Sequence, residues 1–148
     1  MARIAYDSRD AEAFAATRHL SDEALVSWRA AVTRYLTPRP GIRLLDLGSG
    51  TGAWARAFTD WYEGIDVIAV EPSEAMRARS LHPHVVAGDA ENIPLDDDSV
   101  DAVWISTVIH HIPDLARGAQ EIRRVVRPGG LVLIRCAFAG RPQAITLF

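Results

Sequence analysis

Glycines and an acidic residue are concentrated in one short stretch of the chain, Leu44-Leu45-Asp46-Leu47-Gly48-Ser49-Gly50-Thr51-Gly52. An apolar run followed by spaced glycines predicts a strand that enters a tight turn, with a helix beginning near Trp54. Glycines let the backbone approach a ligand closely, and free N–H groups at a helix start can bind a carboxylate or a phosphate. For the glycine pattern alone, a tight turn that binds no ligand stays open as the alternative.

Two acidic residues narrow the kind of ligand. Glu71 ends the next predicted strand, where an acidic side chain can accept hydrogen bonds from ribose hydroxyls. Asp46 lies just before the first glycine, where its charge would repel a pyrophosphate but would suit the sulfonium and ammonium groups of S-adenosylmethionine. A nicotinamide-dependent oxidoreductase would share Glu71 but has no use for Asp46, so it ranks lower.

Four segments in order resemble the motifs of class I S-adenosylmethionine-dependent methyltransferases, in the type 11 branch that acts on small molecules. The segments are the glycine stretch, Ile68 to Met76, Gly88 to Leu95, and Ser99 to Leu131. The resemblance covers about Leu44 to Arg135. It implies an α/β fold, a Rossmann-like doubly wound and mostly parallel sheet with helices on both faces.

The resemblance also implies S-adenosyl-L-methionine as cofactor and methyl transfer to an unidentified small-molecule acceptor. A non-catalytic domain of the same fold that binds S-adenosylmethionine or S-adenosylhomocysteine is the alternative. By likeness, Glu71 would bind the ribose, Asp89 the adenine amino group, and the N–H of Ala90 a ring nitrogen. The residues predicted to bind the cofactor are Asp46, Gly48, Ser49, Gly50, Gly52, Glu71, Pro72, Met76, Asp89, Ala90, Glu91, Ser106, Thr107, Tyr6 and Arg18.

Two of these residues lie near the N-terminus and each has an ordinary alternative. Tyr6 resembles a tyrosine that closes over the cofactor in relatives, and it equally suits a surface position. Arg18 could pair with the methionine carboxylate or lie on a solvated face. Trp54, directly after the glycine turn, is expected to border the cofactor or to pack in the core.

The adjacent histidines His110 and His111 invite a metal or a catalytic role. They lack the i, i+4 spacing of a helical metal pair, and no cysteine or carboxylate cluster completes a coordination sphere, so no metal is expected. One of them is expected to line the acceptor pocket. No catalytic residue is assigned, because the need for a general base depends on the acceptor.

Alternating apolar runs and helical segments must position these residues. A helix is expected after Ser21, with Leu25, Trp28, Val32, Tyr35 and Leu36 on its apolar face, and a weaker one from Asp10 to Thr17. A later helix opens at Pro113-Asp114, with an apolar face of Leu115, Ala119, Ile122 and Val126 and with Arg123, Arg124 and Arg127 on its wet face. The predicted strands are Arg43–Leu47, Asp66–Val70, Val85–Ala87, Val100–Ser106 and Leu131–Arg135.

The composition of the chain indicates its domain organisation, its partners and its location in the cell. The 148 residues, 49% hydrophobic and 24% charged, suit a single domain, with residues 1–40 as a helical cap and 41–148 as the cofactor-binding core. A net charge of -3 predicts no nucleic-acid partner. A single cysteine, Cys136, and an N-terminus without a long apolar stretch predict a cytoplasmic protein with no membrane partner.

The end of the chain departs from the family pattern. Only Cys136 to Phe148 follow the fifth predicted strand, so the last two strands of the usual seven are expected to be missing, as in a C-terminal truncation. The apolar run Leu131 to Ile134 would then be an open sheet edge. Such an edge predicts pairing between copies, a homo-oligomer.

Overall fold

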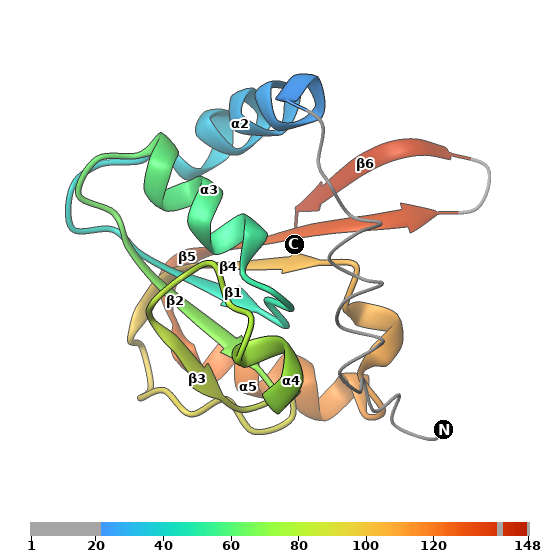
Figure 1. Cartoon of the computed structure of the whole chain (residues 1–148). Coiled ribbons are helices and arrows are strands. Elements are labelled where there is room, and N and C mark those ends of the chain that lie inside the picture. The colour runs from blue at the N-terminus through green and yellow to red at the C-terminus, as the bar shows by residue number, and fades with distance from the viewer. Residues whose placement is uncertain (1–21, 139–140, 148) are drawn as a thin grey trace.

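The computed structural model describes residues 22–138 and 141–147, which form one six-stranded sheet in the order β3-β2-β1-β4-β5-β6 (Figure 1). Strands β1 to β5 pair in parallel, and β6 runs antiparallel to β5. The strands are β1 (Arg43–Leu47), β2 (Asp66–Glu71), β3 (Val85–Ala87), β4 (Val100–Ser106), β5 (Val126–Phe138) and β6 (Arg141–Leu147). This sheet confirms the Rossmann-like class.

The strand order reverses between β1 and β4, which are neighbours in the sheet although β2 and β3 separate them in sequence. In open α/β sheets, ligands bind beyond the carboxyl ends of the strands at such a switch point. The glycine stretch follows β1 and Ser106 ends β4, so both lie at this position. The topology therefore places the predicted cofactor residues at the edge where the fold binds ligands.

Helices cover both faces of the sheet. The helices are α2 (Asp22–Leu36), α3 (Ala53–Trp61), α4 (Glu74–Arg77), the short 3-10 helix η1 (Ile109–His111) and α5 (Leu115–Val125). Figure 1 shows α2 and α3 on one side of the sheet and α5 on the other. None of the helices within the described ranges combines the length and the apolar character that a membrane crossing requires.

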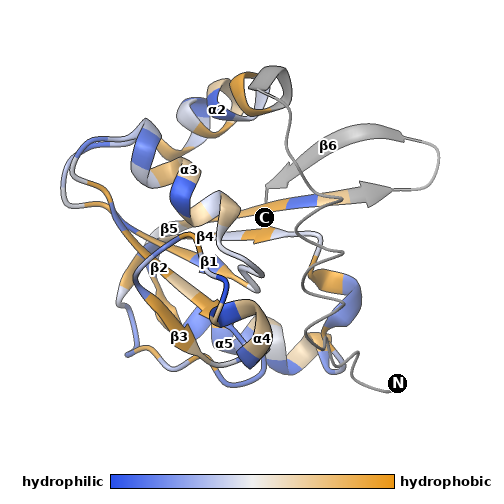
Figure 2. Cartoon of the chain, in the orientation of Figure 1, coloured by the Kyte–Doolittle hydropathy of each residue, from blue (hydrophilic) through white to orange (hydrophobic). Residues whose placement is uncertain are grey.

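The core has two halves, one on each face of the sheet. Leu44 packs in the half that contains α2 and α3, whereas the next residue, Leu45, packs in the half that contains α5. Successive strand residues point to opposite faces, and both faces are covered, so the central strands are almost continuously apolar (Figure 2). This is why the apolar runs in the sequence predict the bounds of β1 and β4.

The expected apolar face after β4 holds for Ile122 and Val126, which pack against the core, but not for Leu115 and Ala119. Leu115 is 56% exposed and Ala119 is also exposed, whereas the buried residues of the helix are Gly118, Glu121 and Val125. Gly118 lets the helix approach its neighbours, because a Cβ there would lie 3.2 Å from the Cγ2 atom of Ile112. The helix is therefore rotated so that an acidic residue faces inward, which apolar periodicity does not predict.

The expected open edge of β5 is also wrong. Strand β6 pairs with β5 from Leu133 to Phe138, so the sheet continues one strand beyond the predicted end. The backbone groups of β5 thereby gain partners on that side, as buried backbone groups require. The weaker helix predicted from Asp10 to Thr17 lies outside the described residues.

Candidate functional site

The glycine bend after β1 depends on backbone conformations that other residues rarely adopt. The φ angles of Gly48, Gly50 and Gly52 are 72°, 57° and 74°. The N–H groups of Gly48 and Ser49 donate to the carbonyl oxygen of Val70 in β2, at 2.8 and 3.1 Å. A Cβ on Gly48 would lie 2.5 Å from a methyl carbon of Val108, so glycine is required there for space as well as for conformation.

Glu71 crosslinks this bend to the start of α4. Its Oε2 atom accepts a hydrogen bond from the N–H of Gly50 and its Oε1 atom one from the N–H of Ser73, both at 2.8 Å. The side chain is buried, which raises its pKa, while the two N–H donors act in the opposite direction. Because a carboxylate offers about four acceptor positions, these two bonds leave room for ribose hydroxyls.

Asp46 lies deeper than the sequence suggests. It is 1% exposed, and its Oδ2 atom accepts a hydrogen bond from the N–H of Ala55 in the first turn of α3, at 3.1 Å. Burial, with a smaller contribution from the charge of Glu71, raises the pKa of Asp46 to about 7. Asp46 therefore holds the start of α3 next to the bend. A cation bound at the bend would favour the ionised form of the Asp46 carboxyl group.

The segment after β3 carries the residues predicted at the adenine. The Oδ1 atom of Asp89 accepts hydrogen bonds from the N–H groups of Glu91 and Asn92, each at 3.0 Å, and Ala90 is buried. The side chain of Glu91 is directed elsewhere, because its Oε1 atom accepts a hydrogen bond from the N–H of Asp114 at 2.9 Å. Glu91 thus links this segment to the start of α5.

Pro72 and Met76, also predicted to bind the cofactor, differ in their surroundings. Pro72 is exposed on the surface after β2, whereas Met76 is only 1% exposed. The N–H of Met76 donates to the hydroxyl of Ser73, which caps α4. Met76 therefore packs in the interior of the protein, whereas Pro72 borders solvent.

The carboxyl end of β4 contains an unusual backbone conformation. Thr107 has a φ of 57°, and its hydroxyl donates to the carbonyl oxygen of Ser106 at 2.7 Å. A left-handed conformation at a β-branched residue costs about 1–3 kcal/mol, and such strain clusters at functional sites. The rings of His110 and His111 follow in η1, with their centroids 3.9 Å apart.

The remaining predicted residues differ in what the structure shows of them. Tyr6 and Arg18 lie outside the described residues. Trp54 is buried against Trp28, Phe58 and Trp104, so it packs in the core. Among the residues that the structure describes, no group of three or more histidine, cysteine, aspartate or glutamate side chains is placed to hold a metal ion.

Sequence reasoning missed the pair Glu121 and Arg124. Arg124 was expected on the wet face of its helix, but its guanidinium contacts Glu121 and the segment after β3. The expectation is wrong because Glu121 is buried and requires a charged partner. The i, i+3 spacing of an acid and a base is the only local signal, and it is common on solvated helix faces.

The residues at the switch point fit an adenosyl amino acid with a positive charge. The bend has positive φ angles and no side chains at three positions, the carboxyl groups of Asp46 and Glu71 lie next to it, and Asp89 lies in the segment after β3. The hydroxyl oxygen of Ser49 is buried and has no hydrogen-bond partner among the described residues. A ligand group bound in the bend would supply one.

Comparison with known proteins points to the same chemistry. The family described as "Methyltransferase domain", type 11, matches residues 45–134. A demethylmenaquinone methyltransferase of Clavibacter sepedonicus is 38% identical over 122 residues, which cover 78% of this chain and 49% of the relative. The chain spans about half the length of the curated relatives that it matches.

Solved structures agree on the fold. A SAM-dependent methyltransferase of Thermotoga maritima, described as a possible histamine N-methyltransferase, has a TM-score of 0.70 and 28% identity, covering 87% of this chain and 59% of that one. A SAM-dependent methyltransferase of Aquifex aeolicus has a TM-score of 0.71 and 19% identity, covering 93% of this chain and 78% of that one. At 19% identity, the second likeness shows the fold alone.

Proposed function

Because the chain belongs to the type 11 family of class I S-adenosylmethionine-dependent methyltransferases, we propose that it transfers a methyl group from its cofactor, S-adenosyl-L-methionine, to a small-molecule acceptor. The observation that carries the proposal is the glycine bend at the sheet's switch point, crosslinked by Glu71. An acidic side chain in this position suits ribose hydroxyls, and a bend above a buried acid suits a cation.

The chain's own residues would act by binding and alignment. The cofactor supplies a methyl group that is already activated by its sulfonium. Glu71 would hold the ribose, Asp89 and Ala90 the adenine, and the backbone of Ser106 and Thr107 the methionine part. Gly48, Ser49, Gly50 and Gly52 would let the backbone approach the ligand. In-line transfer then depends on how well the acceptor is aligned and water excluded.

The acceptor that we propose is a small molecule. The relatives carry names with different acceptors, demethylmenaquinone in one and histamine in another. The loop with His110 and His111 follows β4 at the same edge as the bend, so it would line the acceptor pocket. A screen of small hydroxyl, amine, thiol and carbon acids with radiolabelled S-adenosylmethionine tests this proposal.

The substitution Glu71→Gln tests the cofactor site. An amide offers one oxygen, so the variant can accept from only one of the Gly50 and Ser73 N–H groups and places an NH2 group against the other. We expect the affinity for S-adenosylhomocysteine, measured by isothermal titration calorimetry, to fall about tenfold or more.

Glu74→Gln is the matched control, because Glu74 is an exposed glutamate on α4, three residues away. It should bind S-adenosylhomocysteine like the unmodified chain. Unchanged affinity in Glu71→Gln would refute the ribose assignment. Retained binding with no methylated product in the acceptor screen would favour the non-catalytic alternative over a methyltransferase.

Three wider proposals complete the function. The chain would act as a single domain, residues 1–40 covering the core of 41–148, in the cytoplasm, in line with its single cysteine. It would have no nucleic-acid partner, in line with its net charge of -3. Self-association would use the edge of β6, since β6 ends the described sheet.

A further inference from the structure

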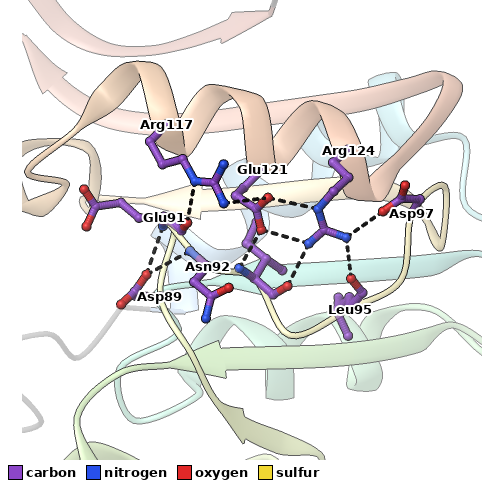
Figure 3. A network of polar contacts seen from close by, with 9 residues as sticks. Asp89, Glu91, Asn92, Leu95, Asp97, Arg117, Glu121 and Arg124 are labelled. Atoms are coloured by element: carbon purple, nitrogen blue, oxygen red, sulfur yellow. Dashed lines mark hydrogen bonds and ion pairs between the residues drawn. The ribbon is translucent and has the colours of Figure 1, made fainter.

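The segment from Gly88 to Asp98, which carries Asp89 and Ala90, contains no helix and no strand of the sheet. Its backbone N–H and C=O groups therefore need partners other than a ladder of regular hydrogen bonds. Side chains of α5 supply these partners (Figure 3). The position of the segment thus depends on one helix that was not predicted to contact it.

Ile93 is held by both of its backbone polar groups. Its N–H donates to the Oε2 atom of Glu121 at 3.0 Å, and its carbonyl oxygen accepts from the Nη2 atom of Arg124 at 2.9 Å. The Ile93 side chain is also buried in the core beneath α5. These contacts leave this residue little freedom to shift or rotate.

Arg124 also binds residues further along the segment. Its Nη1 atom donates to the carbonyl oxygen of Leu95 at 2.7 Å and to the Oδ1 atom of Asp97 at 2.8 Å. Its Nε and Nη2 atoms form a fork on the two carboxylate oxygens of Glu121, at 2.9 and 2.8 Å. Hydrogen bonding from Arg124 lowers the pKa of Glu121 to about 2, so the buried glutamate stays ionised at neutral pH.

The backbone next to Ile93 is hydrogen-bonded to the side chain of Asp89. The N–H groups of Glu91 and Asn92 donate to the carboxylate of Asp89, and Asn92 immediately precedes Ile93. A second arginine of α5, Arg117, donates from Nε to the carbonyl oxygen of Glu91 at 3.1 Å. The orientation of the Asp89 carboxylate is therefore set by backbone groups that α5 holds in place.

We propose that Glu121 and Arg124 are positioning residues that aim Asp89 at the purine amino group and so make the site selective for adenine. The proposal rests on the proposed function, because it concerns the adenine end of the same cofactor site. Both residues act through the backbone of residues 91–95. A pair that only stabilised the fold would affect binding of all purine ligands alike.

The test compares two ligands in the chain and its variants. S-adenosylhomocysteine carries the purine amino group, and S-inosylhomocysteine carries a carbonyl oxygen in its place, which a carboxylate repels. We expect the unmodified chain to prefer the first by about tenfold or more in calorimetric affinity. In Arg124→Lys, which keeps the charge but loses the planar fork, we expect that preference to fall to about threefold or less.

Arg127→Lys is the matched control. Arg127 also donates to a backbone carbonyl, that of Asp98, and pairs with a carboxylate, Asp101, but in the described structure its guanidinium forms no hydrogen bond or ion pair with residues 89–95. Its preference for adenine should equal that of the unmodified chain. Glu121→Gln gives a second, isosteric variant if Arg124→Lys does not fold, and the same loss of preference is expected.

The possible outcomes separate the two proposals. If the unmodified chain binds neither ligand, the proposed function fails. If the chain binds and discriminates, and the folded variants keep its full preference or lose affinity for both ligands by the same factor, the positioning role is overturned. Loss of preference with a retained affinity for S-inosylhomocysteine supports it.

Discussion

The carboxyl group of Asp46 is buried at the end of β1, with one hydrogen bond from the N–H of Ala55. Burial costs more for the ionised form than for the neutral acid, and the neighbouring Glu71 adds repulsion. A folded-state pKa of about 7, against an ordinary value of 3.8, means that folding raises proton affinity here. The residue therefore makes stability depend on pH near neutrality.

The sign of this dependence follows from proton linkage. Between about pH 4 and pH 7 the folded chain binds more protons at Asp46 than the unfolded chain, so the free energy of unfolding contributed by this group falls as pH rises. We expect Asp46→Asn to flatten this fall, since an amide can still accept from Ala55 but does not titrate. Urea unfolding followed by tryptophan fluorescence, repeated across that range, measures it; identical slopes in both proteins would contradict the assignment.

At the scale of elements, α5 depends on the residues at its start. Asp114 is its N-cap, and the Oδ1 atom accepts a hydrogen bond from the N–H of Arg117 at 2.9 Å. At the same end of the helix, the N–H of Asp114 donates a hydrogen bond to the side chain of Glu91. The start of the helix is thus tied to the segment after β3.

Loss of this cap should weaken the helix and the segment that it holds. We expect Asp114→Ala to lower the free energy of unfolding by about 1 kcal/mol, because an N–H of the first turn loses its acceptor. Asp114→Asn keeps a side-chain oxygen and should lose much less. Denaturant titrations of the three proteins provide the comparison, and an equal loss in both variants would show that the charge matters rather than the cap.

At the scale of the whole molecule, β6 closes an edge that would otherwise be open. It pairs with β5 opposite Leu133, Ile134 and Arg135, which lie at the centre of β5. Unpaired strand edges are templates for pairing with another chain. The solubility of the chain should therefore depend on this last strand.

Removing residues 139–148 tests this dependence. The shortened chain exposes the backbone groups of β5, and we expect it to self-associate at concentrations where the full chain sediments as a smaller species. Sedimentation velocity of both proteins gives the answer, with near-ultraviolet circular dichroism to verify that tryptophan packing is retained. A folded, monomeric shortened chain would show that β5 needs no cover.

The local pattern of residues was enough for much of the fold and for the cofactor bend. Strands β1, β3 and β4 have their predicted bounds, and Glu71 ends β2 beside the glycines. These features depend on near neighbours in sequence: short apolar runs, spaced glycines and a following helix. The segment that carries Asp89 was likewise identified from its own residues, although its role at the adenine remains a proposal.

Only the tertiary structure decided which polar groups meet across long separations. Arg124 reaches the carbonyl oxygen of Ile93, 31 residues away, and Asp46 lies under a helix rather than at the surface of the bend. The rotation of α5 arose in the same way. Such contacts depend on how separate elements pack, so the residues that neighbour each partner in the sequence do not determine them.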